Sequence, residues 1–101
     1  MKDKQDNSFL VFPETDEKQR VYTVSELTRE IRSLLEEEFG FVIVEGEVSN
    51  MRQPSSGHCY FTIKDESSQI KVALFRSAYE VQKIKPMDGM LIRVHGELTV
   101  Y

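Results

Sequence analysis

The sequence is poor in the features that mark secreted, membrane-spanning and metal-cluster proteins. Its 101 residues include a single cysteine, Cys59, which excludes an intramolecular disulfide and a cysteine-based metal cluster. The longest purely apolar runs, such as Phe41–Val44, are far short of the roughly 18 residues that a membrane helix needs. Residues 1–6 are polar and charged, where a secretory signal would lead into an apolar stretch. We therefore expect a cytoplasmic protein without a membrane segment.

An excess of basic residues is also missing from the chain as a whole. It carries 13 Lys and Arg against 17 Asp and Glu, a formal net charge of −4. The acidic excess lies within residues 1–40, whereas residues 50–93 carry seven basic and four acidic residues. Because salt screens each charge beyond roughly 8–10 Å, a local basic surface can still attract phosphate. The overall acidity therefore does not exclude nucleic-acid binding.

Length and composition predict one globular domain, with 40% hydrophobic and 30% charged residues. Residues 1–20 are mostly polar, apart from a short apolar patch at 9–12, and we expect them to form a flexible tail. The domain is expected over residues 21–101. At its start Thr23 and Glu26 fit a capping box, and apolar residues then recur every three or four positions. This predicts a helix over residues 24–38.

Beyond Gly40 the apolar period changes from 3.6 to 2, which indicates β-strands. The predicted strands cover residues 41–50, 58–65, 69–76 and 91–100. A hairpin turn is expected at Asp65–Ser68, and a short helix over residues 77–83. Gly46 and Gly96 lie within strands, where glycine indicates a bulge or a sharp bend.

These elements predict a mainly β fold: a strongly bent antiparallel sheet, or partial barrel, of four strands preceded by one helix. The strand pattern still runs at Tyr101, so we expect a fifth, closing strand beyond that residue. The open strand edges that its absence leaves suggest a homodimer formed by edge-to-edge pairing.

Aromatic and basic side chains alternate along one face of the second and third predicted strands. Pairing through the hairpin places Tyr60 and Phe75 on the same face as His58, Lys64 and Lys71. Rings on which bases stack, beside cations that contact phosphates, are typical of single-stranded nucleic-acid surfaces. The alternative is that the two rings pack beneath the helix or a neighbouring domain, with Phe75 more deeply buried than Tyr60.

The connection between the first two strands, residues 52–57, contains Arg52, Ser55 and Ser56, whose side chains can donate hydrogen bonds to phosphate or sugar. Its composition also fits a plain surface turn. No catalytic residue and no cofactor are predicted. No metal site is predicted either, because Glu45 and Glu47 lack a third ligand. Cys59 lies on the apolar side of its strand and is expected to be a small buried hydrophobe.

Six segments occur in a characteristic order: residues 21–27 (VYTVSEL), 44–50 (VEGEVSN), 55–65 (SSGHCYFTIKD), 73–76 (ALFR), 88–90 (DGM) and 94–96 (VHG). Together they resemble the N-terminal domain of the large subunit of bacterial exodeoxyribonuclease VII, over residues 20–101. The resemblance implies an OB-fold, preceded by a helix, that binds and positions single-stranded DNA. It also implies a much longer subunit with nuclease activity in its middle region and a C-terminal region that recruits copies of a small subunit. That holoenzyme degrades single-stranded DNA from both ends to oligonucleotides. Its catalytic residues would lie beyond Tyr101, leaving this fragment inactive alone.

On this chain the expected DNA contacts come from Arg52, Ser55, Ser56, His58, Tyr60, Lys64, Lys71, Phe75 and Arg76. The four arginines and lysines would pair with phosphates, the two rings would stack on bases, and the histidine would donate to sugar or phosphate. A second hypothesis is that the OB-fold serves mainly in subunit assembly or protein interaction, which the net charge of −4 and the apolar patch at 9–12 favour.

Overall fold

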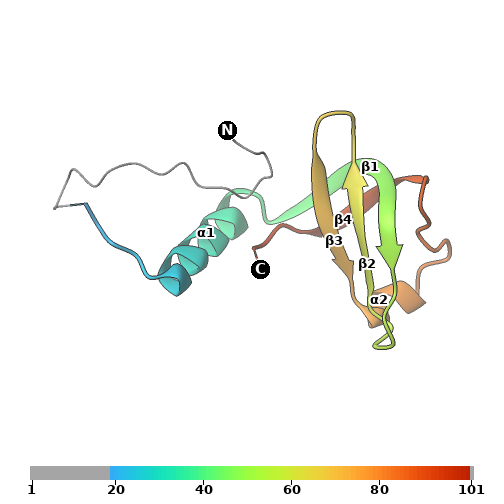
Figure 1. Ribbon diagram of the computed structural model, residues 1–101, viewed down its shortest axis with the longest axis horizontal. Coiled ribbons are helices and arrows are strands. Elements are labelled where there is room, and N and C mark those ends of the chain that lie inside the picture. Colours follow the sequence, from blue (N-terminus) through green and yellow to red (C-terminus); the bar gives the residue numbers. More distant parts are fainter. Residues whose placement is uncertain (1–18, 101) are drawn as a thin grey trace.

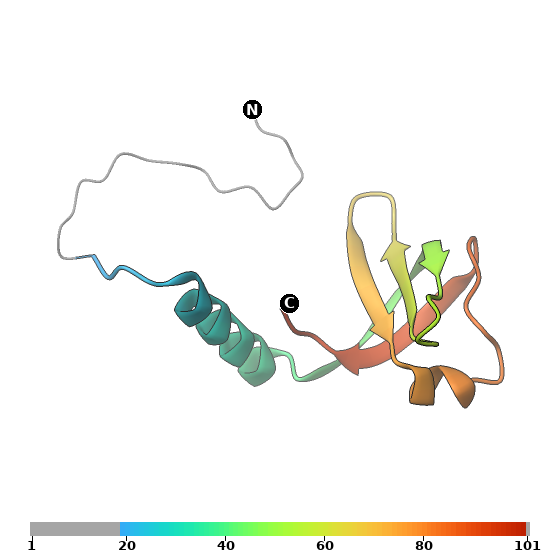
Figure 2. The same cartoon turned by 60° about the horizontal axis from the view of Figure 1, so that its bottom comes forward.

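The computed structural model describes residues 19–100, so nearly all of the expected tail over residues 1–20, with its apolar patch, lies outside the described residues. Along the chain the elements are α1 (Val24–Glu38), β1 (Phe41–Arg52), β2 (Cys59–Lys64), β3 (Gln69–Leu74), α2 (Arg76–Glu80) and β4 (Leu91–Glu97). The four strands form one antiparallel sheet in the order β3-β2-β1-β4, which curls into a half-barrel (Figures 1 and 2). The predicted fold class is confirmed.

Helix α1 begins and ends where local side-chain chemistry predicts. The Thr23 hydroxyl accepts the Glu26 amide at 3.0 Å, and the Glu26 carboxylate accepts the Thr23 amide at 3.0 Å. At the other end Gly40 has a φ of +56°, the left-handed conformation that terminates helices. The helix lies beside the sheet and none of its residues is buried (Figure 1). No helix within residues 19–100 is long and apolar enough to cross a membrane.

Strand β1 is shared between two parts of the sheet. Its first half, from Phe41 to Glu47, pairs with β4, and its second half, from Glu47 onward, pairs with β2. Gly46 lies at the changeover, where an added Cβ would be 3.1 Å from the Ile63 Cβ and from the Lys64 backbone N and O. The absence of a side chain at this position lets β1 pass closely over β2.

The bulge lies a few residues further along β1 than Gly46. Pairing is continuous through Gly46, which faces Ile92, and the register shifts between Ser49 and Arg52. Asn50, inside the shifted segment, has a φ of +54°, a conformation that asparagine tolerates better than most residues. A sharp bend at Gly46 is compatible with the close crossing of β1 over β2. The alternative prediction, a bulge at Gly46, is wrong.

The hydrophobic core lies on the inner face of the curled sheet. Val48, Cys59, Phe61 and Ile63 are buried. Partly buried side chains pack around them: Val44, Met51, Val72, Leu74, Tyr79, Met90, Ile92 and Val94. The period-2 pattern predicted this face, including the buried position of Cys59.

Several predicted boundaries are wrong by one to three residues, including both bounds of β2 and of α2. The third strand ends at Leu74, because Phe75 is already the N-cap of α2, and α2 begins at Arg76. Strand β4 ends at Glu97, because its partner β1 begins opposite at Phe41 and offers no further residues for pairing. The first strand continues past Asn50 to Arg52, which pairs with β2 beyond the register shift.

The β2–β3 hairpin is closed by Asp65. Its amide donates to the Ser68 carbonyl at 3.0 Å, and its carboxylate accepts the amides of Ser67 and Ser68, each at 2.9 Å. Hydrogen bonds to the ionised form hold the pKa of Asp65 below its ordinary value of 3.8. A depressed folded pKa means that these turn interactions are fully present above the unfolded pKa and are lost as the pH falls through the folded pKa.

We therefore expect the amide NMR signals of Ser67 and Ser68 to titrate together, with a midpoint below 3.8. The measurement is a series of amide correlation spectra from pH 6 to pH 2. The Asp65→Asn variant, whose side chain does not ionise, should remove this titration. A midpoint at or above the ordinary aspartate value would contradict the assigned role of the carboxylate.

Candidate nucleic-acid interface

Strands β1, β2 and β3 carry polar side chains on the face opposite the core. Residues directly opposite each other in an antiparallel ladder share a face. The ladder pairs Arg52 with Tyr60, Ser49 with Thr62, Thr62 with Lys71, Tyr60 with Ala73, and Lys64 with Gln69. Glu47 lies opposite Lys64 on the same face. We call this surface the polar face: Glu47, Ser49, Arg52, Tyr60, Thr62, Lys64, Gln69, Lys71 and Ala73. Three of the predicted cations and one predicted ring therefore share one surface.

Arg52 and Tyr60 form the central contact of the polar face. The guanidinium carbon of Arg52 lies 5.0 Å from the centroid of the Tyr60 ring, a cation–π arrangement. Tyr60 is half-buried, so its ring is held by its neighbours and still reaches the surface. A positioned ring beside a cation can bind a base and its phosphate together.

A groove of about 420 Å³ runs beside this pair. It is lined by Asn50, Arg52, Tyr60, Phe61, Thr62, Lys71, Val72 and Ala73. The register of β1 against β2 shifts between Ser49 and Arg52, next to Asn50, and the small Ala73 opposite Tyr60 leaves space beside the ring. Asn50 and Thr62 were not predicted as site residues, because the groove depends on a bulge whose position local sequence does not specify.

Thr62 is the most enclosed polar side chain of the polar face. It is 6% exposed, although it belongs to the same face as the exposed Lys64 and Lys71. Among the hydrogen bonds between residues 19 and 100, none involves its hydroxyl. A buried hydroxyl without a protein partner is unusual.

Just before the first residue of β2, His58 contacts Phe75. Their ring centroids are 5.3 Å apart at an interplanar angle of 75°, and the His58 Nδ1 accepts the Arg76 amide at 2.9 Å. The histidine's other nitrogen, Nε2, then carries the proton of the neutral ring and can donate. Phe75 is 51% exposed, so the expectation that it is more buried than Tyr60 is wrong. As the N-cap of α2 it lies past the end of the ladder that would cover it.

The β1–β2 loop forms its own hydrogen bonds. The Gly57 amide donates to the Pro54 carbonyl at 2.9 Å, and the His58 amide donates to the Ser56 hydroxyl at 3.3 Å. Ser55 is exposed. Gly57 lies against the side chain of Arg76, so the loop and the start of α2 meet at this end of the sheet. The structure thus brings Ser56, His58, Phe75 and Arg76 together at the start of β2, close in sequence to the groove residues Tyr60 and Ala73, and Ser55 lies exposed in the same loop.

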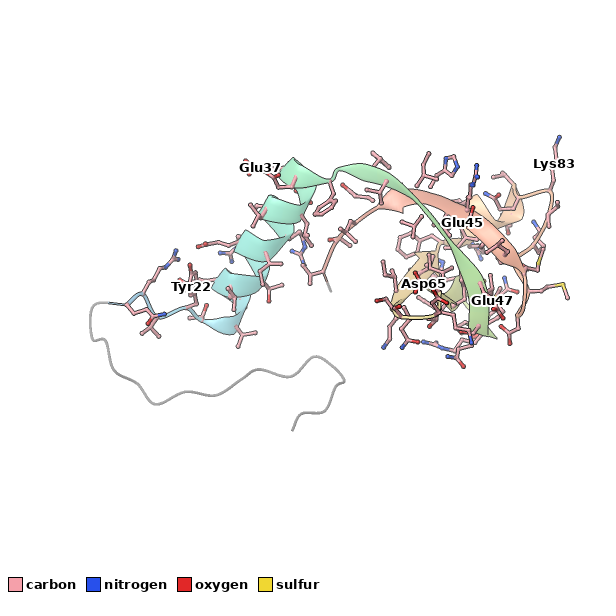
Figure 3. The ribbon with its side chains drawn as sticks, turned by 90° about the horizontal axis from the view of Figure 1, so that it is seen from above. Tyr22, Glu37, Glu45, Glu47, Asp65 and Lys83 are labelled. Carbon is pink, nitrogen blue, oxygen red and sulfur yellow. The ribbon has the colours of Figure 1, made fainter. Side chains whose placement is uncertain are left out.

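Arg93 and Cys59 have partners within the fold. The Arg93 guanidinium binds the Glu45 carboxylate at 3.1 Å, on the part of β1 that pairs with β4 (Figure 3). The Cys59 thiol donates to the Met51 thioether at 3.0 Å, and burial raises the pKa of this thiol. Across the described part of the chain, no three His, Cys, Asp or Glu side chains gather as a metal site would require.

Comparison with known proteins agrees with this architecture. Residues 22–101 match the family described as "OB-fold nucleic acid binding domain". The chain belongs to this OB-fold family. The match covers the helix and all four strands, so the curled sheet is the body of the OB-fold and the polar face is one of its surfaces.

Curated relatives of this OB-fold chain share one name. It is 50% identical over 91 residues to the exodeoxyribonuclease 7 large subunit of Geobacter metallireducens, a match that covers 90% of this chain and 19% of the relative. It is 52% identical over 82 residues to the protein of that name from Geobacter sulfurreducens, covering 81% of this chain and 18% of the relative. The Enterobacter sp. (strain 638) protein of that name is 44% identical over 81 residues, a match that covers 80% of this chain and 18% of the relative.

The OB-fold chain thus spans about a fifth of the length of the curated relatives it matches. The resemblance seen in the ordered sequence motifs is confirmed.

Proposed function

We propose that this OB-fold is the single-stranded DNA-binding module of an exodeoxyribonuclease VII large subunit. The observation that carries the proposal is the polar face, where the Arg52 guanidinium lies over the Tyr60 ring beside Lys71 and Lys64. It supplies a stacking surface and several phosphate-binding cations on one rigid sheet, which is what a single strand requires. The names of the relatives support the choice of a nuclease subunit.

A DNA strand on this surface would run along β2. At about 3.3 Å per residue the six residues of β2 span roughly 20 Å, which suits the short end of the 4–16 nucleotides bound by single OB-folds. Arg52, Lys64 and Lys71 would contact phosphates, with Tyr60 stacking on a base. Near the first residues of β2, the exposed Phe75 ring, which contacts His58, offers a second stacking position. There His58 Nε2, Ser55, Ser56 and Arg76 offer donors to the sugar–phosphate backbone.

The larger assembly is part of the same proposal. The complete subunit would cleave phosphodiester bonds in single-stranded DNA, in the cytoplasm and together with a small subunit. This fragment would position the DNA without cleaving it, because no predicted catalytic residue lies within it. We further propose that β3 and β4, the edge strands of the described sheet, permit a homodimer of the fragment.

The test is fluorescence anisotropy of a labelled oligo-dT strand titrated with the folded chain at 50 and 200 mM salt, with duplex DNA as competitor. Three phosphate contacts predict about a 20-fold loss of affinity between these salt concentrations, from a slope near −0.7 per contact for single strands. Duplex DNA should compete weakly. Absence of binding by a sample with an intact β-sheet spectrum would contradict the proposal.

A second candidate function, protein assembly, has its own support. Phe41, Ile43 and Leu91 are 82%, 64% and 70% exposed on the outer side of the β1–β4 ladder. Val24 and Leu34 of α1 are 85% and 57% exposed. Such a surface favours contact with the rest of a large subunit. Salt-independent association of the chain with other subunit regions, without DNA binding, would favour this function.

A further inference from the structure

The groove beside Tyr60 is shaped by small side chains among large ones. Thr62 and Ala73 are small, whereas Tyr60, Arg52 and Lys71 are large, and all five line the groove. Thr62 lies opposite Lys71 in the β2–β3 ladder, and Ala73 lies opposite Tyr60. The small side chains leave space between the large ones.

We propose that this groove is a subsite for a single nucleobase and that it prefers bases with ring carbonyl oxygens, such as thymine, over adenine. The proposal rests on the proposed function and adds to it a base position and a base preference.

The hydrogen-bonding groups of the groove explain the preference. The Lys71 ammonium and the Arg52 guanidinium only donate. Among the described residues lining the groove there is no aspartate or glutamate to accept from a base amino group. Thymine presents carbonyl acceptors, whereas adenine presents an amino donor beside a ring nitrogen. Adenine in this groove would leave its amino group without a charged acceptor. The side-chain amide of Asn50 both donates and accepts hydrogen bonds, so it does not discriminate between the two bases.

Thr62 is the residue that points to a ligand. The residue is 6% exposed and lines the groove, and none of the side-chain hydrogen bonds among residues 19–100 involves its hydroxyl. A base edge that enters the groove brings an acceptor to this hydroxyl and removes the deficit. Valine in its place would satisfy packing alone, since it has nearly the same shape.

The experiment separates the base from the backbone. Strands of abasic sugar–phosphate units carry a single central thymine, a single central adenine or no base, and their affinities are measured by anisotropy for the wild type, Thr62→Val and Thr99→Val. We expect the wild type to bind the thymine strand about 3- to 10-fold more tightly than the adenine strand. Thr62→Val should weaken binding of both base-containing strands without changing the affinity for the abasic strand, because the edge of either base brings an acceptor to the hydroxyl. Thr99→Val, at an exposed position outside the sheet, should behave as the wild type.

A second variant tests the cavity itself. Ala73→Val fills the space beside Tyr60 and should reduce the affinities of both base-containing strands to that of the abasic strand. Equal affinities of the wild type for thymine and adenine strands would overturn the base preference, and affinities no higher than that for the abasic strand would overturn the base subsite. Either result leaves the proposed function standing. Failure of the folded wild type to bind any strand would instead overturn the proposed function.

Discussion

Tyr60→Ala is expected to weaken binding of single-stranded oligo-dT by about 1–3 kcal/mol, or roughly 5- to 150-fold in dissociation constant. The variant removes both the ring on which a base would stack and the surface that holds the Arg52 guanidinium, 5.0 Å from the ring centroid. The loss should persist at high salt, because stacking is screened less than phosphate contacts. Anisotropy titrations at two salt concentrations measure both effects.

Two variants serve as controls for Tyr60→Ala. Tyr60→Phe keeps the ring and should retain nearly all of the affinity. Tyr22→Ala removes the ring of a similar pair, in which the Arg20 guanidinium lies 4.2 Å from the Tyr22 centroid. Figure 3 shows Tyr22 near the end of α1 farthest from the sheet. We expect no change for Tyr22→Ala, and an equal loss in both alanine variants would contradict a specific role for Tyr60.

Gly46→Ala is expected to destabilise the domain by about 1–3 kcal/mol. Its methyl group would lie 3.1 Å from the Ile63 Cβ and from two backbone atoms of Lys64, and β2 cannot retreat without disturbing the core around Ile63. For a domain of this size each kcal/mol lowers the melting temperature by roughly 4–8 °C. Thermal and urea denaturation, followed by circular dichroism, measure the loss.

Gly96→Ala is the matched control, since Gly96 is also a glycine within a strand paired to β1. A Cβ at this position would meet only the Val94 Cγ1, at 4.0 Å, which is ordinary contact. This variant should be neutral or slightly stabilising, because alanine restricts the unfolded chain. Equal destabilisation of both variants would show that the loss comes from strand glycines in general and would remove the close crossing as its cause.

Much of the fold follows from local sequence. The capping box at Thr23 and the left-handed Gly40 specify both ends of α1 with groups that lie within a few residues of each other. Asp65 closes the hairpin through its own carboxylate, and strand alternation places Phe61 and Ile63 in the core. Each of these features depends on contacts within one element or between adjacent ones, which a pattern can predict.

The site was only partly predictable, because its shape depends on contacts between distant segments. Strand alternation correctly places Tyr60 and Lys71 on one face. The groove between them depends on the register shift between Ser49 and Arg52, within the part of β1 that pairs with β2. The alternative that Phe75 is the more buried of the two rings is wrong, because its strand ends at Leu74 and α2 begins at Arg76. The binding roles of all these residues remain predictions.

The sharing of β1 between two partners also has a consequence for the order of folding. The β2–β3 ladder closes through a tight turn, whereas the β1–β4 ladder joins Phe41 to Glu97, across most of the domain's sequence. Local pairings form quickly, and distant ones wait for the loop entropy to be overcome. We expect β4 to join last and to exchange its amide hydrogens first in native-state exchange. The three strands that carry the polar face would then stay paired while the β4 side of the half-barrel opens.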